Sequence, residues 1–183
     1  DGLTLEGAPL PPGGAFPLGT DLLGRDLASR LILGTRTSLI IGVLANGIAV
    51  ILGAGVGITA GYFGGWVAGV LMRFTDLMMA FPALLLAIVL AAIFQPSLLI
   101  VALVIAMVNW VQMARVIYTE TRSLTERDFV QVQRSIGSGH LRILGAHLLP
   151  HLLSSIVVFG TLGISTTVLL EATLSYLGVG VQP

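Results

Sequence analysis

Two histidines at helical spacing are the first residues in this chain that could support chemistry. His147 and His151 are four residues apart, a spacing at which two imidazoles can bind one metal ion from a helix. No carboxylate or third ligand is positioned with them, and Pro150 intervenes, so we expect no metal site. The chain also lacks Cys, which excludes disulfides and thiolate metal sites.

Nucleophilic catalysis and ATP hydrolysis are the next possibilities. Ser165 and neighbouring hydroxyl residues lie in an apolar segment, but no G-x-S-G motif occurs and no His lies in such a segment to act as a base. No phosphate-binding glycine loop is present and the chain has no Lys. We therefore expect no catalytic residue, no bound cofactor and no ATP hydrolysis by this chain alone.

Polar side chains within apolar segments are a further set of candidates. A charge at the centre of a bilayer costs about 2.5–3.5 kcal/mol, so polar and charged residues within a span are candidates for a functional role. Arg73 and Asp76 are three apart and can pair on one helical face. Glu171 lies near the end of its segment. Asn109 and Gln112 lie deeper and are the better candidates for lining a pathway, although a hydrogen bond between helices explains them equally well.

Composition indicates the solvent in which these residues must fold. The chain has 183 residues, of which 55% are apolar and 10% charged, and its mean hydropathy is +0.98. Soluble domains carry about 25% charged residues, so we expect a membrane protein. The formal net charge is zero, which gives no support to nucleic-acid binding.

Four apolar segments are long enough to cross a bilayer, which requires roughly 20 helical residues. We expect an all-α polytopic membrane protein whose transmembrane domain covers residues 37–175. Its spans are expected at residues 37–61, 66–94, 98–118 and 152–170.

Two features of these spans bear on packing. Gly53, Gly57 and Gly61 lie on one face of the first span, where small residues let helices approach closely. This face is either a sliding surface for conformational change or, as we favour, a static contact. Pro82 kinks the second span and is either a hinge or a fixed bend.

The regions at the two ends differ from the spans. Residues 1–36 are expected to form an external loop rich in Pro and Gly, followed over Asp21–Gly34 by an amphipathic helix. That helix lies either at the membrane interface or against another subunit. Residues 176–183 read as an external loop, and we expect the chain to be truncated at both ends.

Arginine placement predicts the orientation of the spans. Residues 119–150, between the third and fourth spans, contain four arginines, and Arg115 lies just before them, whereas the connection at Gln95–Ser97 has no charge. The positive-inside rule therefore places residues 119–150 in the cytoplasm. Arg25, Arg30 and Arg36 oppose this orientation.

The connection of residues 119–150 is long for a turn between spans. Its apolar residues suggest two short helices, broken at Gly137 and Gly139 because glycine accepts the positive φ of a tight turn. Such a helical hairpin is either a docking element for a partner or an interfacial loop without one.

Five motifs in order resemble the dipeptide, oligopeptide and nickel permease family of type I ABC importers. The family's coupling motif runs E-A-A, three residues, G, nine residues, I-x-L-P, and Gly137 and Pro150 keep that spacing. The other four matches are Gly19-Thr-Asp-Leu-Leu-Gly-Arg-Asp-Leu-Ala-Ser-Arg30, Ala60-Gly-Tyr-Phe-Gly-Gly65, Met72-Arg-Phe-Thr-Asp76 and Glu171-Ala-Thr-Leu-Ser-Tyr-Leu-Gly-Val-Gly180.

The resemblance implies a six-span subunit, of which this chain would hold four spans, with a cytoplasmic coupling hairpin (the EAA loop) between the third and fourth. The residues that the resemblance places against an ATPase subunit are Asp128, Gln131, Val132, Gln133, Arg134, Gly137 and Pro150. Gln131-Val-Gln133 replaces the family's Glu-Ala-Ala, which predicts either weaker coupling or a partner surface adapted to amides.

The same resemblance implies the function and the partners. The chain would be the permease subunit of an importer that moves peptides, or nickel, across the cytoplasmic (inner) membrane of a prokaryote by alternating access. ATP and Mg would bind to two ATP-binding subunits, identical or different. A second homologous permease, an extracytoplasmic substrate-binding protein and membrane lipid would complete the assembly. The alternative is a stand-alone channel or scaffold, which would not need the hairpin.

Overall fold

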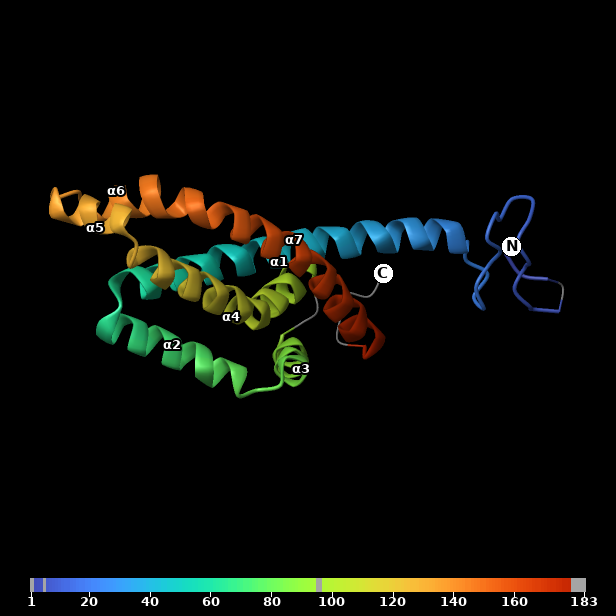
Figure 1. The fold of residues 1–183 in the computed structure, drawn as a ribbon. Coiled ribbons are helices and arrows are strands. Elements are labelled where there is room, and N and C mark those ends of the chain that lie inside the picture. Colours follow the sequence, from blue (N-terminus) through green and yellow to red (C-terminus); the bar gives the residue numbers. More distant parts are fainter. Residues whose placement is uncertain (1, 5, 95–96, 179–183) are drawn as a thin grey trace. The chain divides into compact units, whose positions relative to one another are not determined.

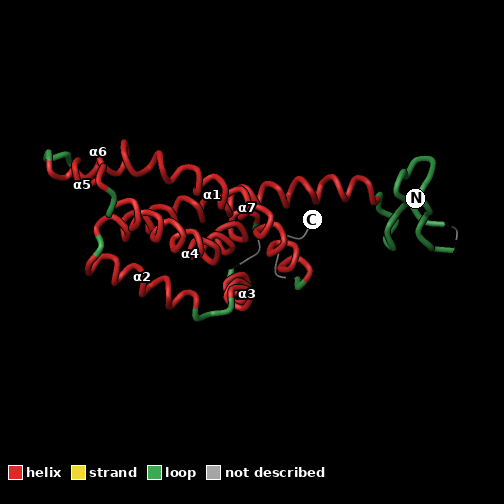
Figure 2. Tube along the Cα trace, viewed as in Figure 1, coloured by secondary structure: helices red, strands yellow, loops and turns green. Residues whose placement is uncertain are grey.

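The computed structural model describes residues 2–4, 6–94 and 97–178, and within these ranges its regular secondary structure is entirely helical (Figures 1 and 2). Three helical stretches are long and apolar enough to cross a membrane, and a bent helix pair makes four if it counts as one span. The predicted all-α membrane fold is therefore confirmed. The connection at Gln95 and the end of the 176–183 loop lie outside the described residues. The chain divides into two compact units, of which the first extends to Ile40 and the second begins at Ile41.

The first unit shows that the expected amphipathic helix over Asp21–Gly34 is not a separate element. Residues 21–25 form turns, and α1 begins at Leu27 and continues unbroken to Phe63. Asp26 fixes this start, because its carboxylate accepts hydrogen bonds from the Ser29 backbone N–H at 3.1 Å and from the Ser29 hydroxyl at 2.5 Å. An acidic residue at this position satisfies backbone donors that a helix start leaves unpaired.

Asp21 organises the loop that precedes α1. Its carboxylate accepts hydrogen bonds from the backbone N–H groups of Leu23 and Arg25, and it pairs with the guanidinium groups of Arg25 at 2.9 Å and Arg30 at 2.7 Å. These donors, first among them the Arg25 N–H, hold the pKa of Asp21 well below its usual range. The motif from Gly19 to Arg30 is therefore a network that folds the loop onto the start of α1.

In the second unit, the glycine face of α1 packs against α4 (Leu98–Thr125). A Cβ atom at Gly53 would lie 2.5 Å from the Trp110 carbonyl oxygen, and one at Gly57 would lie 2.6 Å from that of Ala114. At Gly61 it would lie 2.6 Å from Thr121 Cβ. Any side chain larger than hydrogen would force the helices apart, so this contact requires glycine.

The expected second span is two helices rather than one kinked helix. α2 covers Gly65–Met79 and α3 covers Ala83–Ile93, and their axes differ by 84°. Pro82 immediately precedes α3 and cannot donate the backbone hydrogen bond that would continue α2. The bend is therefore much sharper than the kink that the sequence predicts.

The expected pairing of Arg73 with Asp76 also differs in the structure. The Asp76 carboxylate instead forms an ion pair with the Arg115 guanidinium of α4. Spacing along one helix predicted the wrong partner because the sequence does not show which helix lies beside α2. The observed pair connects α2 to α4.

The chain after α4 forms the predicted hairpin and then the last span. Helices α5 (Asp128–Ser135) and α6 (His140–Arg142) are followed by a π-helix at Ile143–Leu148 and by α7 (Leu149–Tyr176). The helical path is continuous from His140 to Tyr176, so this span begins earlier than the predicted residue 152. Pro150 lies within this continuous path, two residues after the end of the π-helix, and has no N–H to donate to the preceding turn.

Replacing Gly57 tests the contact between α1 and α4. Gly57→Ala should lower the free energy of unfolding by about 1–3 kcal/mol, because the added methyl group overpacks the contact. Thermal unfolding of the purified protein in nanodiscs measures the change. Gly55→Ala is the matched control, because Gly55 is exposed on the same helix and a Cβ atom there would have no neighbouring atom within 4 Å. Equal melting temperatures for both variants would contradict the contact.

Replacing Asp21 tests the loop network. Asp21→Asn should increase trypsin cleavage after Arg25 and Arg30 at neutral pH, with Glu6→Gln in the same loop as the control. The pKa of Asp21 is lower in the folded loop than its ordinary value of about 3.9. The stabilisation that Asp21 gives the folded loop is therefore complete above about pH 3.9 and is lost as the pH falls towards the lowered pKa. Limited proteolysis at neutral pH measures the difference; unchanged cleavage would show that the network does not order the loop.

Candidate functional site

The hairpin of residues 128–150 has one face against the helix bundle and one face that is exposed. Val130 is fully buried in a cluster with Tyr62, Ile143 and Leu148. By contrast, three large apolar side chains between residues 128 and 142 are exposed: Val132 by 56%, Ile136 by 69% and Leu141 by 86%. The buried face packs the hairpin against the helix bundle, and the opposite face presents exposed apolar side chains. We call these three residues the hairpin surface.

The turn of the hairpin depends on Gly137. Its φ is +78°, a conformation that strongly favours glycine, and its N–H donates to the Arg134 carbonyl at 3.1 Å. Ser138 closes the turn by donating its hydroxyl to Gln133 Oε1 at 2.7 Å. Gly139 was also predicted to adopt a positive φ, but its φ is −64°, a value that does not require glycine.

Tyr62 connects the end of α1 to both halves of the hairpin. The side chain is only 5% exposed, and its hydroxyl lies 2.8 Å from His140 Nδ1 of α6. The Arg134 guanidinium of α5 lies over the Tyr62 ring at 4.9 Å from the centroid and donates to the Tyr62 carbonyl at 3.4 Å. Tyr62 lies within the Ala60–Gly65 motif, but its role as a contact between α1 and the hairpin was not predicted from the sequence.

His147 and His151 are engaged within the hairpin and the start of α7. The His151 ring donates from Nδ1 to the His147 carbonyl at 2.8 Å. The same ring stacks on Phe129 with centroids 5.1 Å apart and an angle of 20° between the planes. The His151 side chain therefore contributes to the packing of α5 against α7.

A pocket of about 130 Å³ lies among α1, α4 and α7 and brings together both predicted pathway residues, Asn109 and Gln112. Asn109 donates its amide to the Thr167 hydroxyl at 3.1 Å, so it joins α4 to α7. Asn46 of α1 also lines the pocket and was missed from the sequence, where it is the one amide in a long uncharged segment.

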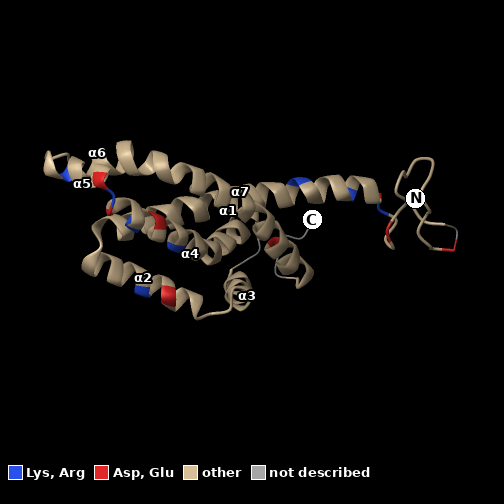
Figure 3. Ribbon diagram, viewed as in Figure 1, with Lys and Arg blue, Asp and Glu red and all other residues tan. Residues whose placement is uncertain are grey.

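The distribution of charge separates the hairpin from the helix bodies. Figure 3 shows long parts of α1, α4 and α7 without charged side chains. Between the last turn of α4 and the end of α5, by contrast, the chain carries Arg122, Glu126, Arg127, Asp128 and Arg134. Uncharged helix bodies suit a hydrocarbon environment, and the charged end suits water or a protein partner.

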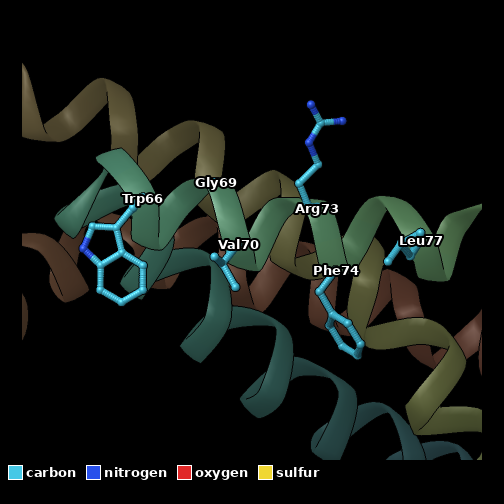
Figure 4. A pocket seen from close by; sticks show the side chains of 6 residues that line it. All are labelled: Trp66, Gly69, Val70, Arg73, Phe74 and Leu77. Carbon is cyan, nitrogen blue, oxygen red and sulfur yellow. The ribbon is translucent and has the colours of Figure 1, made fainter.

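Helix α2 carries a shallow pocket of about 510 Å³ (Figure 4). The side chains of Trp66, Val70 and Phe74 extend to one side, and the Arg73 guanidinium extends to the other. Trp66 is 79% exposed. Because one helix supplies the whole lining, this surface suits contact with lipid or another apolar face rather than enclosure of a small molecule.

Curated transport proteins resemble this chain along most of its length. It is 38% identical over 172 residues to the glutathione transport system permease protein of Pectobacterium atrosepticum, covering 94% of this chain and 57% of the relative. It is 39% identical to the dipeptide transport system permease protein of Alkalihalophilus pseudofirmus, covering 93% and 56%. It is 40% identical to the di/tripeptide transport system permease protein of Pseudomonas aeruginosa, covering 92% and 55%.

The alignments cover only part of the length of each relative. The chain spans a little over half the length of the curated relatives it matches. Residues 53–183 match the family described as the binding-protein-dependent transport system inner membrane component. This range includes the glycine face, the hairpin and the α4 and α7 residues of the 130 Å³ pocket. This chain therefore belongs to that family of multi-pass, type I ABC permeases of the cytoplasmic membrane.

Proposed function

We propose that this chain is the membrane-spanning permease part of an ATP-driven importer of small peptides, and that its hairpin docks a separate ATP-binding subunit. Family membership supports the permease role. The relatives described above are named for transport of glutathione, dipeptides and di/tripeptides, which favours peptides as the cargo over nickel.

The exposed hairpin surface is the observation that carries the proposal. Val132, Ile136 and Leu141 project from a hairpin that is otherwise rich in charged and polar residues. An apolar patch with a polar rim is typical of a protein interface. Asp128 and Arg134 lie on the same helix and supply part of that rim.

The hairpin is connected to the spans in a way that suits transmission of movement. α7 continues helically from His140, so a displacement of the hairpin reaches the last span directly. Tyr62 provides a second connection, to the end of α1. In the proposed cycle, ATP and Mg bind to a pair of ATP-binding subunits, and closure of that pair moves the hairpins of this chain and of a second permease. A substrate-binding protein delivers the peptide from outside, and the spans alternate between outward and inward access.

A charge at the hairpin turn tests the docking role. Gly137→Asp should abolish association with the ATP-binding subunits and peptide uptake, because it adds a carboxylate and strains a residue at φ +78°. Co-purification of the intact transporter from membranes, together with uptake of a radiolabelled dipeptide, measures both effects.

The matched control for this variant is Gly7→Asp. Gly7 has φ +77° and, like Gly137, would have no atom within 4 Å of an added Cβ. The two variants therefore impose the same kind of backbone strain and the same charge at positions far apart in the sequence. Normal uptake by Gly137→Asp would refute docking at the hairpin. If the wild-type subunit never associates with an ATP-binding subunit but still conducts peptides, the chain acts as a stand-alone channel.

Replacing Tyr62 tests whether movement passes from the hairpin to the spans, separately from docking of the ATP-binding subunit. Tyr62→Phe removes the hydroxyl that contacts His140 but keeps the ring beneath Arg134. A single hydrogen bond contributes about 0.5–1.5 kcal/mol, so uptake per ATP hydrolysed should fall by roughly 2- to 10-fold while ATP-binding subunits remain associated.

The control for Tyr62→Phe is Tyr118→Phe on α4, whose hydroxyl makes no hydrogen bond to the residues that the structure describes. A double-mutant cycle with His140→Ala separates the coupling between Tyr62 and His140 from the other effects of each substitution. Additive losses in that cycle would show that the contact between Tyr62 and His140 does not transmit movement.

A further inference from the structure

The polar pocket among α1, α4 and α7 is built from uncharged hydrogen-bonding groups. Asn46, Asn109 and Gln112 contribute carboxamides, and Thr166 contributes a hydroxyl. Its volume is about 130 Å³, and none of the described residues that line it is ionisable. The lining therefore offers both donors and acceptors without a charge.

Two of the three carboxamides are held in place by neighbouring helices. Asn46 is 8% exposed and donates its amide to the Gly160 carbonyl of α7. Asn109 donates to the Thr167 hydroxyl at 3.1 Å. A Cβ atom at Gly163 would collide with the Asn46 side chain, so glycine there makes room for the amide. These amides are therefore oriented before any ligand arrives.

Gln112 differs from the other two amides. It lies near the middle of α4, its side chain is exposed, and it has no hydrogen-bond partner among the residues that the structure describes. An unpaired carboxamide facing hydrocarbon is strongly unfavourable. This face of α4 is consequently expected to adjoin water, protein or a polar ligand rather than lipid.

Gln112 also borders a second pocket, of about 250 Å³, beside the bend between α2 and α3. Met78, Met79, Phe81 and Pro82 form much of its lining. Methionine side chains are flexible and adapt to apolar groups of different shape. The two pockets together place hydrogen-bonding amides next to an adaptable apolar surface.

We propose that these adjoining pockets form a subsite of the translocation pathway in which the carboxamides bind the peptide bond of the cargo and the methionine-lined pocket receives its side chains. A peptide bond presents one donor and one acceptor, which a carboxamide can pair with simultaneously. The lining lacks the carboxylates and imidazoles that a divalent metal ion would need. This inference rests on the proposed function and specifies the cargo chemistry at one place in the spans.

Replacement of Gln112 tests the subsite in the intact transporter. Gln112→Met keeps the length of the side chain and removes its hydrogen-bonding groups. Dipeptide uptake should fall about tenfold while the ATP-binding subunits remain associated with the variant. The defect should be smaller for a dipeptide whose peptide nitrogen is methylated, because that cargo cannot donate the hydrogen bond.

Two threonines of α7 supply a matched pair of further variants. Thr166 lines the pocket and Thr161 does not, and each hydroxyl bonds a carbonyl of its own helix. Thr166→Val should lower dipeptide uptake and Thr161→Val should leave it unchanged.

The outcomes separate failure of the subsite from failure of the proposed function. Normal uptake by Gln112→Met in an assembled transporter would overturn the subsite and leave the permease role intact. Loss of the second permease from the purified complex would overturn it too, because Gln112 would then be a contact between subunits. Wild-type protein that never assembles with an ATP-binding subunit would instead overturn the proposed function.

Discussion

The close approach of α1 to α4 is the constraint on which both candidate sites depend. In hydrocarbon, helices associate through close packing and hydrogen bonds between them, because burying apolar surface there brings no gain over contact with lipid. Gly53, Gly57 and Gly61 permit that packing by bringing the α1 backbone against α4. Asn46 lies one heptad before Gly53 and so shares its face, which brings it to the pocket beside Asn109. Tyr62 follows Gly61 directly and comes to lie beneath the hairpin.

The hairpin and the pocket differ in how rigidly they are held, and this difference suits their proposed roles. Buried Val130 and the contacts of Tyr62 attach the hairpin to the ends of three helices, so it can move only together with them. The pocket contains two amides fixed between helices and one, Gln112, that is exposed. A relative movement of α1, α4 and α7 would therefore change the pocket, and the hairpin is attached to the same helices.

Sequence alone predicted the class of fold, because length and hydropathy are sufficient to recognise membrane helices. Prediction from the sequence was wrong where a specific side-chain contact determines the structure. Leucine periodicity suggested a helix from Asp21, but Asp26 caps the helix that actually forms. Spacing suggested that Asp76 pairs along α2, but Arg115 on α4 is its partner. The position of the bend at Pro82 was predicted from the sequence, but its size of 84° was not, because that angle depends on how α2 and α3 each pack.

The replacement of Glu-Ala-Ala by Gln131-Val-Gln133 has a local structural account. Gln131 donates its amide to the Thr125 carbonyl at 3.0 Å, at the end of α4 where carbonyls lack helical partners, and an ionised carboxylate could not donate this bond. Gln133 accepts the Ser138 hydroxyl at the turn. Both amides thus stabilise the hairpin itself, while Val132 between them is 56% exposed. In the proposed complex this part of the contact is therefore apolar, and its strength should depend on buried surface rather than on charge, with little sensitivity to salt.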